Sequence, residues 1–404
     1  MRIVFLNDVE ARGGAAICAS RLAASLAQSG HEITRIVAYP GSGAHPWKTK
    51  PLNLPETLIL RARRKLYPAA FYEKSCSVLL QKNLDEILAG LNPDWINIHN
   101  LHSAIPKGWR DDLVKVCLNR APTVWTLHDM WSFTGRCAYA YDCRRFLSGC
   151  DENCPTPNEY PALAPHRIRN VWLKREHLMR ELSNLIAVTP SQWLAGEAKQ
   201  GFWKDHRIEI IPYGIPLQTF CPMEKDNARK ALGLPTDQPV LLLVSVDLTE
   251  RRKGSAFLMK ALDLLPFKVT VITLGANPPE IHGKHILHRP LGYVEDDSTK
   301  CMAYNAASLL VHPSIADNLP NVILESIACG TPVVAFNTGG VEDAVRPGVT
   351  GWLADAISAE SLAKAIEMGL DHSKELAGSC RRVAEEEYSD DLQARRYLQL
   401  MESR

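Results

Sequence analysis

The chain has 404 residues, which is too long for one compact core and predicts two domains. Its hydrophobic content of 46%, charged content of 23% and net charge of +1 are ordinary for a globular protein, and they provide no overall field that would attract nucleic acid. No apolar run approaches the roughly 18 residues of a membrane-spanning helix, and the first residues turn polar too soon for a secretion signal. We therefore expect a cytoplasmic protein without a nucleic-acid partner, in which the 11 cysteines are reduced or bound to metal.

Short apolar runs alternate with helical patterns in two successive sets. The first set of expected strands comprises residues 3–7, 32–38, 95–99, 123–128, 185–189 and 208–212. The second set comprises residues 240–246, 268–274, 286–293, 308–312, 332–336 and 352–354. Continuous apolar runs are typical of parallel strands that are covered on both faces. Alternation with helices therefore predicts two doubly wound α/β domains.

The boundary between these domains is expected where the alternation stops. Prolines and mixed charges interrupt the pattern at residues 214–226, so residues 1–215 form the first expected domain and residues 216–385 the second. Residues 386–404 carry apolar side chains at helical spacing and predict a C-terminal helix.

Two features of the first domain lie where ligands bind in open α/β sheets, at the carboxyl ends of strands. Gly13 and Gly14 separate the first strand from a helix, and a glycine pair lets the backbone approach a phosphate or a sugar closely. The full G-x-G-x-x-G pattern is absent, so an ordinary tight turn is the alternative. His99, His102 and His128 follow two further strands; His99 and His102 either line a cleft or brace the loop.

Four cysteines lie close together after His128. Cys137, Cys143, Cys150 and Cys154 have the spacing C-x5-C-x6-C-x3-C. Four thiolates in a short loop predict a structural zinc site. The spacing lacks the C-x2-C pairs of zinc fingers and ribbons, so a loop without metal is one alternative. Two local disulfides are another, which the expected compartment disfavours.

Two basic amphipathic stretches predict contact with an anionic membrane surface. One covers residues 58–67 with Phe71 and Tyr72 beyond it, and the other covers residues 166–177. Cations beside aromatic and aliphatic side chains suit anionic lipid. The alternative is a helix that packs one face into the core of the first domain.

In the second domain, a basic turn and an acidic helix start are the candidate site. Arg252 and Lys253 follow the strand at 240–246 and form either an anion site or a solvated turn. Pro320 predicts the first helical position, which would leave the N–H groups of Asn318 and Leu319 facing solvent as an anion site. 

Two carboxylates flank that helix start. Asp317 precedes it, and Glu325 lies about two turns into an apolar helix, where an acid suits a pair of sugar or ribose hydroxyls. The alternative is that Asp317 only caps the helix and Glu325 is solvated.

The stretch 313–340 resembles the acid–x7–Glu region of the retaining GT-B glycosyltransferases of family 4. Its sequence Ala-Asp-Asn-Leu-Pro at residues 316–320 resembles that of bacterial exopolysaccharide transferases of the colanic-acid type. The resemblance implies two Rossmann-like domains that face a central cleft, with the C-terminal helix crossing back onto the first domain. It also implies transfer of a sugar from a nucleotide donor with retention of configuration, and no metal required for catalysis.

For the first domain, the resemblance implies that Gly13 and Gly14 lie over the donor phosphates and that His128 contacts the donor sugar. In the second domain, Arg252 and Lys253 would take the leaving diphosphate. Leu248 stands where the family has an arginine, so Arg252 or Arg251 would supply the guanidinium.

The remaining implied contacts are also in the second domain. Asp317 and the backbone of Asn318 and Leu319 would hold the sugar hydroxyls and phosphate, and Glu325 would hold the ribose. Tyr293, together with Tyr304, would stack on the base or close the nucleotide pocket.

The implied partners are a UDP- or GDP-sugar donor and a glycan or lipid-linked acceptor, in bacterial polysaccharide biosynthesis. Two other functions stay open: a nucleotide-sugar 2-epimerase-like isomerase on the same fold, and a non-catalytic glycan-binding scaffold. The acid–x7–Glu stretch and the Lys-Gly turn argue against the isomerase.

Overall fold

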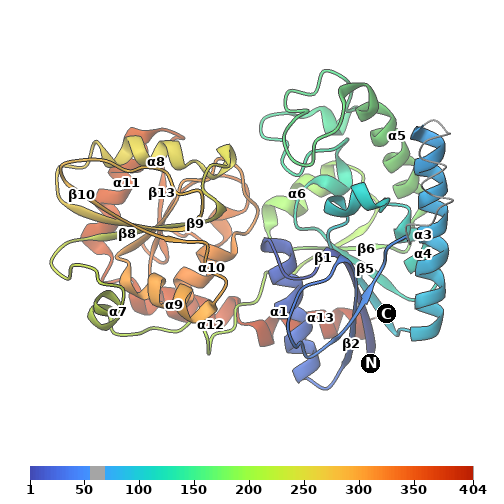
Figure 1. The fold of residues 1–404 in the computed structure, drawn as a ribbon, viewed down its shortest axis with the longest axis horizontal. Helices are drawn as coiled ribbons and strands as arrows, with labels where there is room; N and C mark the ends of the chain where they lie inside the picture. Colours follow the sequence, from blue (N-terminus) through green and yellow to red (C-terminus); the bar gives the residue numbers. More distant parts are fainter. Residues whose placement is uncertain (55–68, 404) are drawn as a thin grey trace. The chain divides into compact units, whose positions relative to one another are not determined.

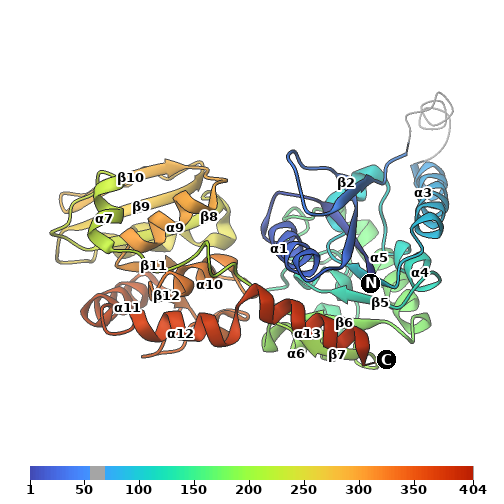
Figure 2. The same ribbon diagram turned by 90° about the horizontal axis from the view of Figure 1, so that it is seen from below.

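The computed structural model describes the backbone of residues 1–54 and 69–403, and the side chains of residues 1–54 and 75–403. The chain divides into two compact units. The first contains Met1–Ile211 with Arg396–Arg404, and the second contains Pro212–Arg395. In each unit, helices cover both faces of one sheet (Figures 1 and 2).

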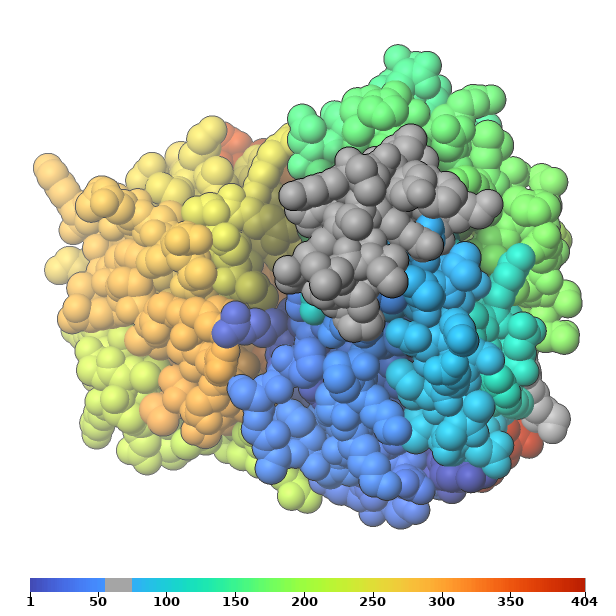
Figure 3. Space-filling model, turned by 45° about the vertical axis from the view of Figure 1, so that its right-hand side comes forward, coloured from blue at the N-terminus to red at the C-terminus, as the bar shows by residue number. Residues whose placement is uncertain are grey.

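The sheet of the first unit has seven parallel strands in the order β3-β2-β1-β4-β5-β6-β7. Its strands are β1 (Arg2–Val9), β2 (Glu32–Tyr39), β3 (Lys48–Pro51), β4 (Trp95–Ile98), β5 (Thr123–Thr126), β6 (Ile186–Thr189) and β7 (Arg207–Ile210). Its helices are α1 (Gly14–Gln28), α3 (Ala69–Leu91), α4 (Leu113–Leu118), α5 (Pro165–Glu181) and α6 (Gln192–Gln200). The outer surface of α3, in light blue, is visible in Figure 3.

The sheet of the second unit has six parallel strands in the order β10-β9-β8-β11-β12-β13. They are β8 (Val240–Asp247), β9 (Val269–Ala276), β10 (Ile286–Gly292), β11 (Leu309–His312), β12 (Val333–Phe336) and β13 (Gly351–Ala354). The helices are α7 (Lys225–Ala231), α8 (Ser255–Leu262), α9 (Asp297–Ala306), α10 (Asn321–Ala328), α11 (Ala359–His372), α12 (Ala377–Glu387) and α13 (Asp390–Glu402). Helices α8 and α11 lie on one face, and α9 and α10 on the other (Figure 1).

The prediction of two doubly wound parallel sheets is confirmed, and all twelve expected strands are present with ends shifted by at most two residues. Strand β3 was not predicted. Its sequence Lys-Thr-Lys-Pro is polar, and it lies at the edge of the sheet with β2 as its neighbour. An edge strand exposed to solvent needs no apolar run, which explains the omission.

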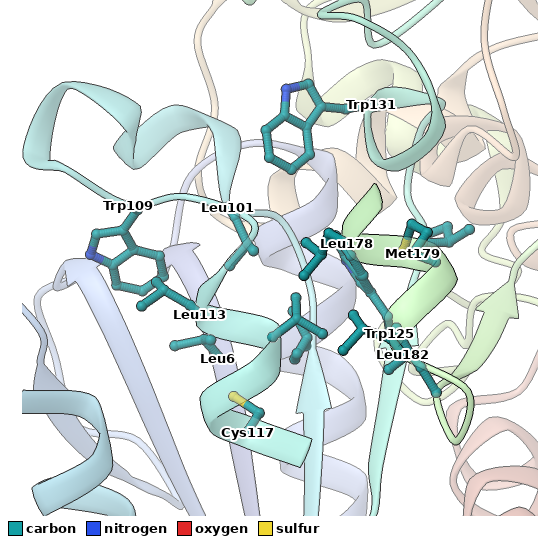
Figure 4. Close-up of a cluster of buried hydrophobic side chains, with 14 of the residues drawn as sticks. Leu6, Leu101, Trp109, Leu113, Cys117, Trp125, Trp131, Leu178, Met179 and Leu182 are labelled. Atoms are coloured by element: carbon teal, nitrogen blue, oxygen red, sulfur yellow. The ribbon is translucent and has the colours of Figure 1, made fainter. Parts of the chain in front are cut away.

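Tryptophans in the core of the first unit hold the loops at the carboxyl edge of its sheet. Trp109 and Trp125 lie in a buried apolar cluster with Leu6, Leu101 and neighbouring side chains (Figure 4). The indole N–H of Trp125 donates to the carbonyl of His99 at 3.1 Å, and that of Trp109 donates to the carbonyl of Leu52 at 3.0 Å. These bonds satisfy buried indoles and fix the segment that follows β4.

The last part of α13 packs in the first unit. Tyr397 is fully buried, and its hydroxyl lies 2.8 Å from the hydroxyl of Thr126, at the end of β5. The start of the same helix belongs to the second unit, where Ile215 pairs with Ser389.

Candidate active site

Asp317 is the centre of a charged cluster in the second unit. Its side chain is buried, and Oδ2 accepts a hydrogen bond from Lys253 Nζ at 2.6 Å. Arg252 Nη1 lies 3.2 Å and His312 Nε2 lies 3.5 Å from the same oxygen. Burial alone would raise the pKa of Asp317, but Lys253 and Arg252 hold it well below its usual value. The carboxylate is therefore ionised at neutral pH.

Two glycines allow the surrounding loops to meet at this cluster. Gly254 follows Lys253 with φ 70°, and a Cβ there would lie 1.8 Å from the carbonyl oxygen of Pro313. Gly339 has φ 59°, and a Cβ there would lie 1.8 Å from the carbonyl oxygen of Asp317. Both positions require glycine, for backbone conformation and for space. The loops after β8, β11 and β12 thus converge at the carboxyl edge, where open α/β sheets bind ligands.

The structure distinguishes between the two arginines of the basic turn. Arg252 Nη1 donates to the carbonyl of Ala316 at 2.8 Å, in addition to its approach to Asp317. Arg251 is exposed. Leu248, at the position of the family's arginine, is buried and apolar. Arg252 is therefore the guanidinium placed beside Asp317.

The start of α10 differs from the prediction. Pro320 is the residue before the helix rather than its first residue, because its ψ of 126° is extended. Asn318 and Leu319 are buried, and the N–H of Asn318 donates to Asp317 Oδ1 at 3.1 Å. The expectation that these N–H groups face solvent was therefore wrong for Asn318, because the neighbouring carboxylate turns back onto the backbone.

Glu325 lies inside α10 and is buried, so the alternative of a solvated acid is wrong. Its Oε2 accepts a hydrogen bond from the hydroxyl of Tyr304 at 2.7 Å. Tyr304 is itself buried in α9, whereas Tyr293, just after β10, is 45% exposed. Of the two tyrosines expected near a base, Tyr293 is thus the one whose ring is accessible.

In the first unit, His128 and His99 form a buried pair. His128 Nε2 lies 2.9 Å from His99 Nδ1, so one ring donates and the other accepts. Burial lowers the pKa of His128 to about 4, and burial followed by the His128 charge lowers that of His99 well below its usual value. Both rings are neutral at physiological pH. His99 Nε2 is buried and has no hydrogen-bond partner among the described residues.

Beside this pair lies a second network, which the sequence patterns did not predict. His102 Nε2 lies 3.0 Å from Asp129 Oδ2, and His102 Nδ1 lies 2.9 Å from the hydroxyl of Tyr160. The Tyr160 hydroxyl also contacts Ser103 Oγ, and the N–H of Ser103 donates to Asp8 Oδ2 at 2.7 Å. Burial opposes protonation of His102, but Asp129 raises its pKa above the usual value. Of these residues, sequence patterns singled out only His102, as a residue that lines a cleft or braces the loop.

The Gly13–Gly14 turn begins α1. Gly13 precedes the helix with φ 88°, a left-handed conformation that favours glycine, and its carbonyl accepts from Ile17 N–H at 3.0 Å. Glu10, three residues before Gly13, is buried. Its carboxylate accepts hydrogen bonds from Trp47 Nε1 at 2.9 Å and from Gly41 N–H at 2.8 Å. This carboxylate ties the turn to the segment that leads into β3.

The four cysteines after His128 are all free thiols. Cys137 shares a hydrogen bond with Cys154, and Cys150 Sγ accepts from Gly135 N–H at 3.2 Å. Within residues 1–54 and 75–403, no three His, Cys, Asp or Glu side chains are grouped to hold a metal ion. The described arrangement does not fit a zinc ion without movement of these side chains, so a zinc site here stays a prediction that metal analysis would test.

Of the two basic stretches, only the second lies among the residues whose side chains the structure describes. Residues 58–67, Phe71 and Tyr72 lie outside the part of the chain whose side chains are described. Residues 166–177 lie in α5, which buries Ile168 and Trp172 and exposes the opposite face. No helix in the described chain is both long and apolar enough to cross a membrane.

Comparison with known proteins matches both parts of the chain to glycosyltransferase families. Residues 12–219 match the family described as Glycosyltransferase Family 4, and residues 238–372 match the family described as Glycosyl transferases group 1. The chain is 29% identical over 265 residues to a putative colanic acid biosynthesis glycosyl transferase, WcaC, of Escherichia coli K12. That alignment covers 63% of this chain and 62% of the relative, so the chain spans less than two thirds of the relative's length.

Solved structures agree on the fold. Sucrose-phosphate synthase from Thermosynechococcus elongatus matches 100% of this chain and 98% of its own, with a TM-score of 0.73 and 20% identity. HepE of Anabaena, solved with UDP and glucose, covers 100% of both chains with a TM-score of 0.68 and 19% identity.

Proposed function

Because the chain belongs to glycosyltransferase family 4, we propose that it is a retaining glycosyltransferase that moves a sugar from a nucleotide-sugar donor to a glycan or lipid-linked acceptor. The observation that carries this proposal is the Asp317 cluster, in which two cations face one buried carboxylate at the ligand-binding edge of a parallel sheet. The name of the Escherichia coli relative supports a role in bacterial polysaccharide biosynthesis.

The chemistry needs stabilisation of a leaving nucleoside diphosphate. In the proposed reaction, the bond from the anomeric carbon to the diphosphate breaks, and the acceptor oxygen bonds to that carbon on the same face. The acceptor proton passes to an oxygen of the departing diphosphate. Lys253 and Arg252 would neutralise the negative charge that develops there, without a metal ion.

Other residues of the site would hold the sugar and the ribose of the donor. Asp317 and the backbone of Asn318 and Leu319 would hold the sugar, and Glu325, positioned by Tyr304, would accept hydrogen bonds from the ribose hydroxyls. The assignment of His128 to the donor sugar and of Gly13 and Gly14 to its phosphates rests on the family. UDP is the first candidate nucleotide, because HepE was solved with it, and GDP is the second.

Calorimetric titration of the full chain with UDP and then GDP, in EDTA, tests the donor site. Wild-type protein should bind one of the two, and Glu325→Ala should lose that binding while Glu360→Ala, which removes an exposed acid from α11, should retain it. Failure of folded wild-type protein to bind any of UDP, GDP, ADP or dTDP would overturn the proposal and favour a glycan-binding scaffold.

The exposed side chains of α5 indicate where the proposed enzyme would act. The exposed face of α5 carries Arg167, Arg169 and Lys174, together with Leu173, which is 41% exposed. Such a surface suits the inner face of an anionic membrane, where a lipid-linked acceptor would be held. We therefore propose a cytoplasmic enzyme that binds peripherally to the membrane.

A further inference from the structure

We propose that Tyr160 binds a hydroxyl of a saccharide acceptor, and that His102 and Ser103 hold the tyrosine in place for this contact. The inference rests on the proposed function and names a residue on the acceptor side. It concerns the first unit alone, at the edge of the sheet formed by the ends of β1, β4 and β5.

The hydrogen-bond directions follow from the chemistry of the partners. Asp129 is ionised, because its burial is outweighed by His102, which lowers its pKa below the usual value. A carboxylate can only accept, so His102 Nε2–H donates to Asp129 across 3.0 Å. The other ring nitrogen, Nδ1, lies 2.9 Å from the Tyr160 hydroxyl. It accepts the O–H when the ring is neutral, and it donates when the ring, whose pKa Asp129 raises, is protonated.

In either state the Tyr160 hydroxyl has one hydrogen bond left for a ligand. A phenol hydroxyl can donate one hydrogen bond and accept two, and His102 Nδ1 and Ser103 Oγ use two of these three. Burial of the hydroxyl raises the pKa of Tyr160 to about 12, and Asp8, Asp129 and Tyr39 add to that rise. The phenol therefore stays protonated at neutral pH.

The ring of Tyr160 supplies the second part of the contact. The residue is 61% exposed although its hydroxyl turns inward to His102, and Tyr39 at the end of β2 is 36% exposed. An aromatic ring that presents an apolar face beside a fixed polar atom suits a ligand with both kinds of surface. A sugar ring has apolar C–H faces and a rim of hydroxyls, so the class of ligand that fits is a neutral saccharide.

The buried His102 ring has two partners, of which Tyr160 supplies one. His102 and Asp129 are buried, and their mutual hydrogen bond already pairs the imidazole with the carboxylate. The substitution Tyr160→Phe should leave that pair in place, although His102 Nδ1 loses its partner. Nucleotide titration of the same variant therefore shows whether a loss of glycoside binding is local.

Saturation-transfer NMR on the full chain, with methyl glycosides of glucose, galactose and fucose as probes, measures the contact directly. Wild-type protein should bind at least one glycoside, and Tyr160→Phe should weaken that binding by about 2- to 10-fold, as expected for loss of one hydrogen bond between neutral groups. The matched control is Tyr141→Phe, which removes a hydroxyl that donates to Glu159 Oε2 at 3.0 Å in the same segment. This control should bind as the wild type does.

Nucleotide titration on the same samples separates this inference from the proposed function. Tyr160→Phe should bind UDP or GDP as the wild type does. If Tyr160→Phe binds glycosides with unchanged affinity, or if wild-type protein binds none of the three, the inference is overturned, whereas nucleotide binding would still support the transferase. If glycosides bind through Tyr160 but no nucleotide binds, the inference stands and the transferase proposal fails.

Discussion

At the scale of single residues, the Asp317 cluster combines two cations, which we propose serve catalysis, with one anion that holds them. Lys253 and Arg252 come from the turn after β8, and without Asp317 they would repel each other in a half-buried setting. Burial lowers the pKa of His312 despite the nearby carboxylate, so this histidine adds no third charge at neutral pH. Two cations facing one buried anion leave the cluster suited to an incoming diphosphate.

Replacing Lys253 should separate its role from that of the neighbouring arginine. We expect Lys253→Ala to lower kcat by roughly 10²–10³-fold, because a preorganised charge that stabilises the leaving diphosphate is lost. Lys253→Arg should recover part of the rate, and Arg251→Ala, which changes an exposed cation of the same turn, should have little effect. Donor-dependent release of nucleotide measures kcat, and an unchanged rate in Lys253→Ala would remove the residue from the active site.

Sequence patterns identified most residues of this cluster but not their contacts. Asp317 and Lys253 were predicted from the family's motifs. Arg252 and Arg251 both remained candidates for the arginine, because Leu248 stands at the family's position. The choice of Arg252 over Arg251 depends on the hydrogen bond to Ala316, 64 positions away, which no local pattern encodes. His312 and the contacts of His102 with Tyr160 and Asp129 were missed for the same reason, because these residues are brought together only by the folded sheet.

At the scale of elements, α5 has both an apolar face that packs in the core and an exposed basic face. Its apolar face packs in the core of the first unit, as the structural alternative predicted, and the basic face stays available. Buried Arg175 belongs to the core side, where its guanidinium donates to the carbonyls of Trp131 and Thr134 and pairs with Asp111 at 2.8 Å. The count of basic residues in the sequence thus overstated the charge available for a membrane.

The exposed charges of α5 should support binding to anionic vesicles. We expect the full chain to bind vesicles that contain phosphatidylglycerol, more weakly as salt is raised, and not neutral phosphatidylcholine vesicles. Combined substitution of Arg167, Arg169 and Lys174 by alanine should weaken binding by about 100-fold, since each of the three cations near an anionic surface contributes about 1 kcal/mol. The control replaces Lys364, Lys374 and Arg382, which are exposed cations of the second unit. Equal loss in the control and the α5 variant, or equal binding to both kinds of vesicle, would contradict the prediction.

At the scale of the whole molecule, the chain crosses between the units more than once. The first unit contains the residues up to Ile211 and then Arg396–Arg404, so it includes the end of a helix that begins in the second unit. The sequence predicted the helix from its apolar spacing, and the strands from their continuous apolar runs. Apolar spacing does not specify which unit buries each side chain. Tyr388, between α12 and α13, is buried in the second unit, whereas Tyr397, within α13, is buried in the first.

These two tyrosines allow the stability of each unit to be changed separately. Tyr397 hydrogen-bonds with Thr126 in the first unit, and Tyr388 donates to the carbonyl of Asp343 at 2.9 Å in the second. Tyr397→Phe should lower the free energy of unfolding of the first unit by about 1 kcal/mol through loss of a buried hydrogen bond. Tyr397→Ala should lower it by about 3–5 kcal/mol, because a large buried side chain leaves a cavity.

Hydrogen exchange followed by mass spectrometry locates these losses along the chain. In Tyr397→Ala, peptides from β5 should lose protection while peptides from β12 keep it, and UDP or GDP binding by the second unit should persist. Tyr388→Ala should give the opposite pattern, since its hydroxyl and ring are buried in the second unit. Equal loss of protection in both units, in either variant, would mean that the two units unfold as one cooperative body and would contradict the prediction.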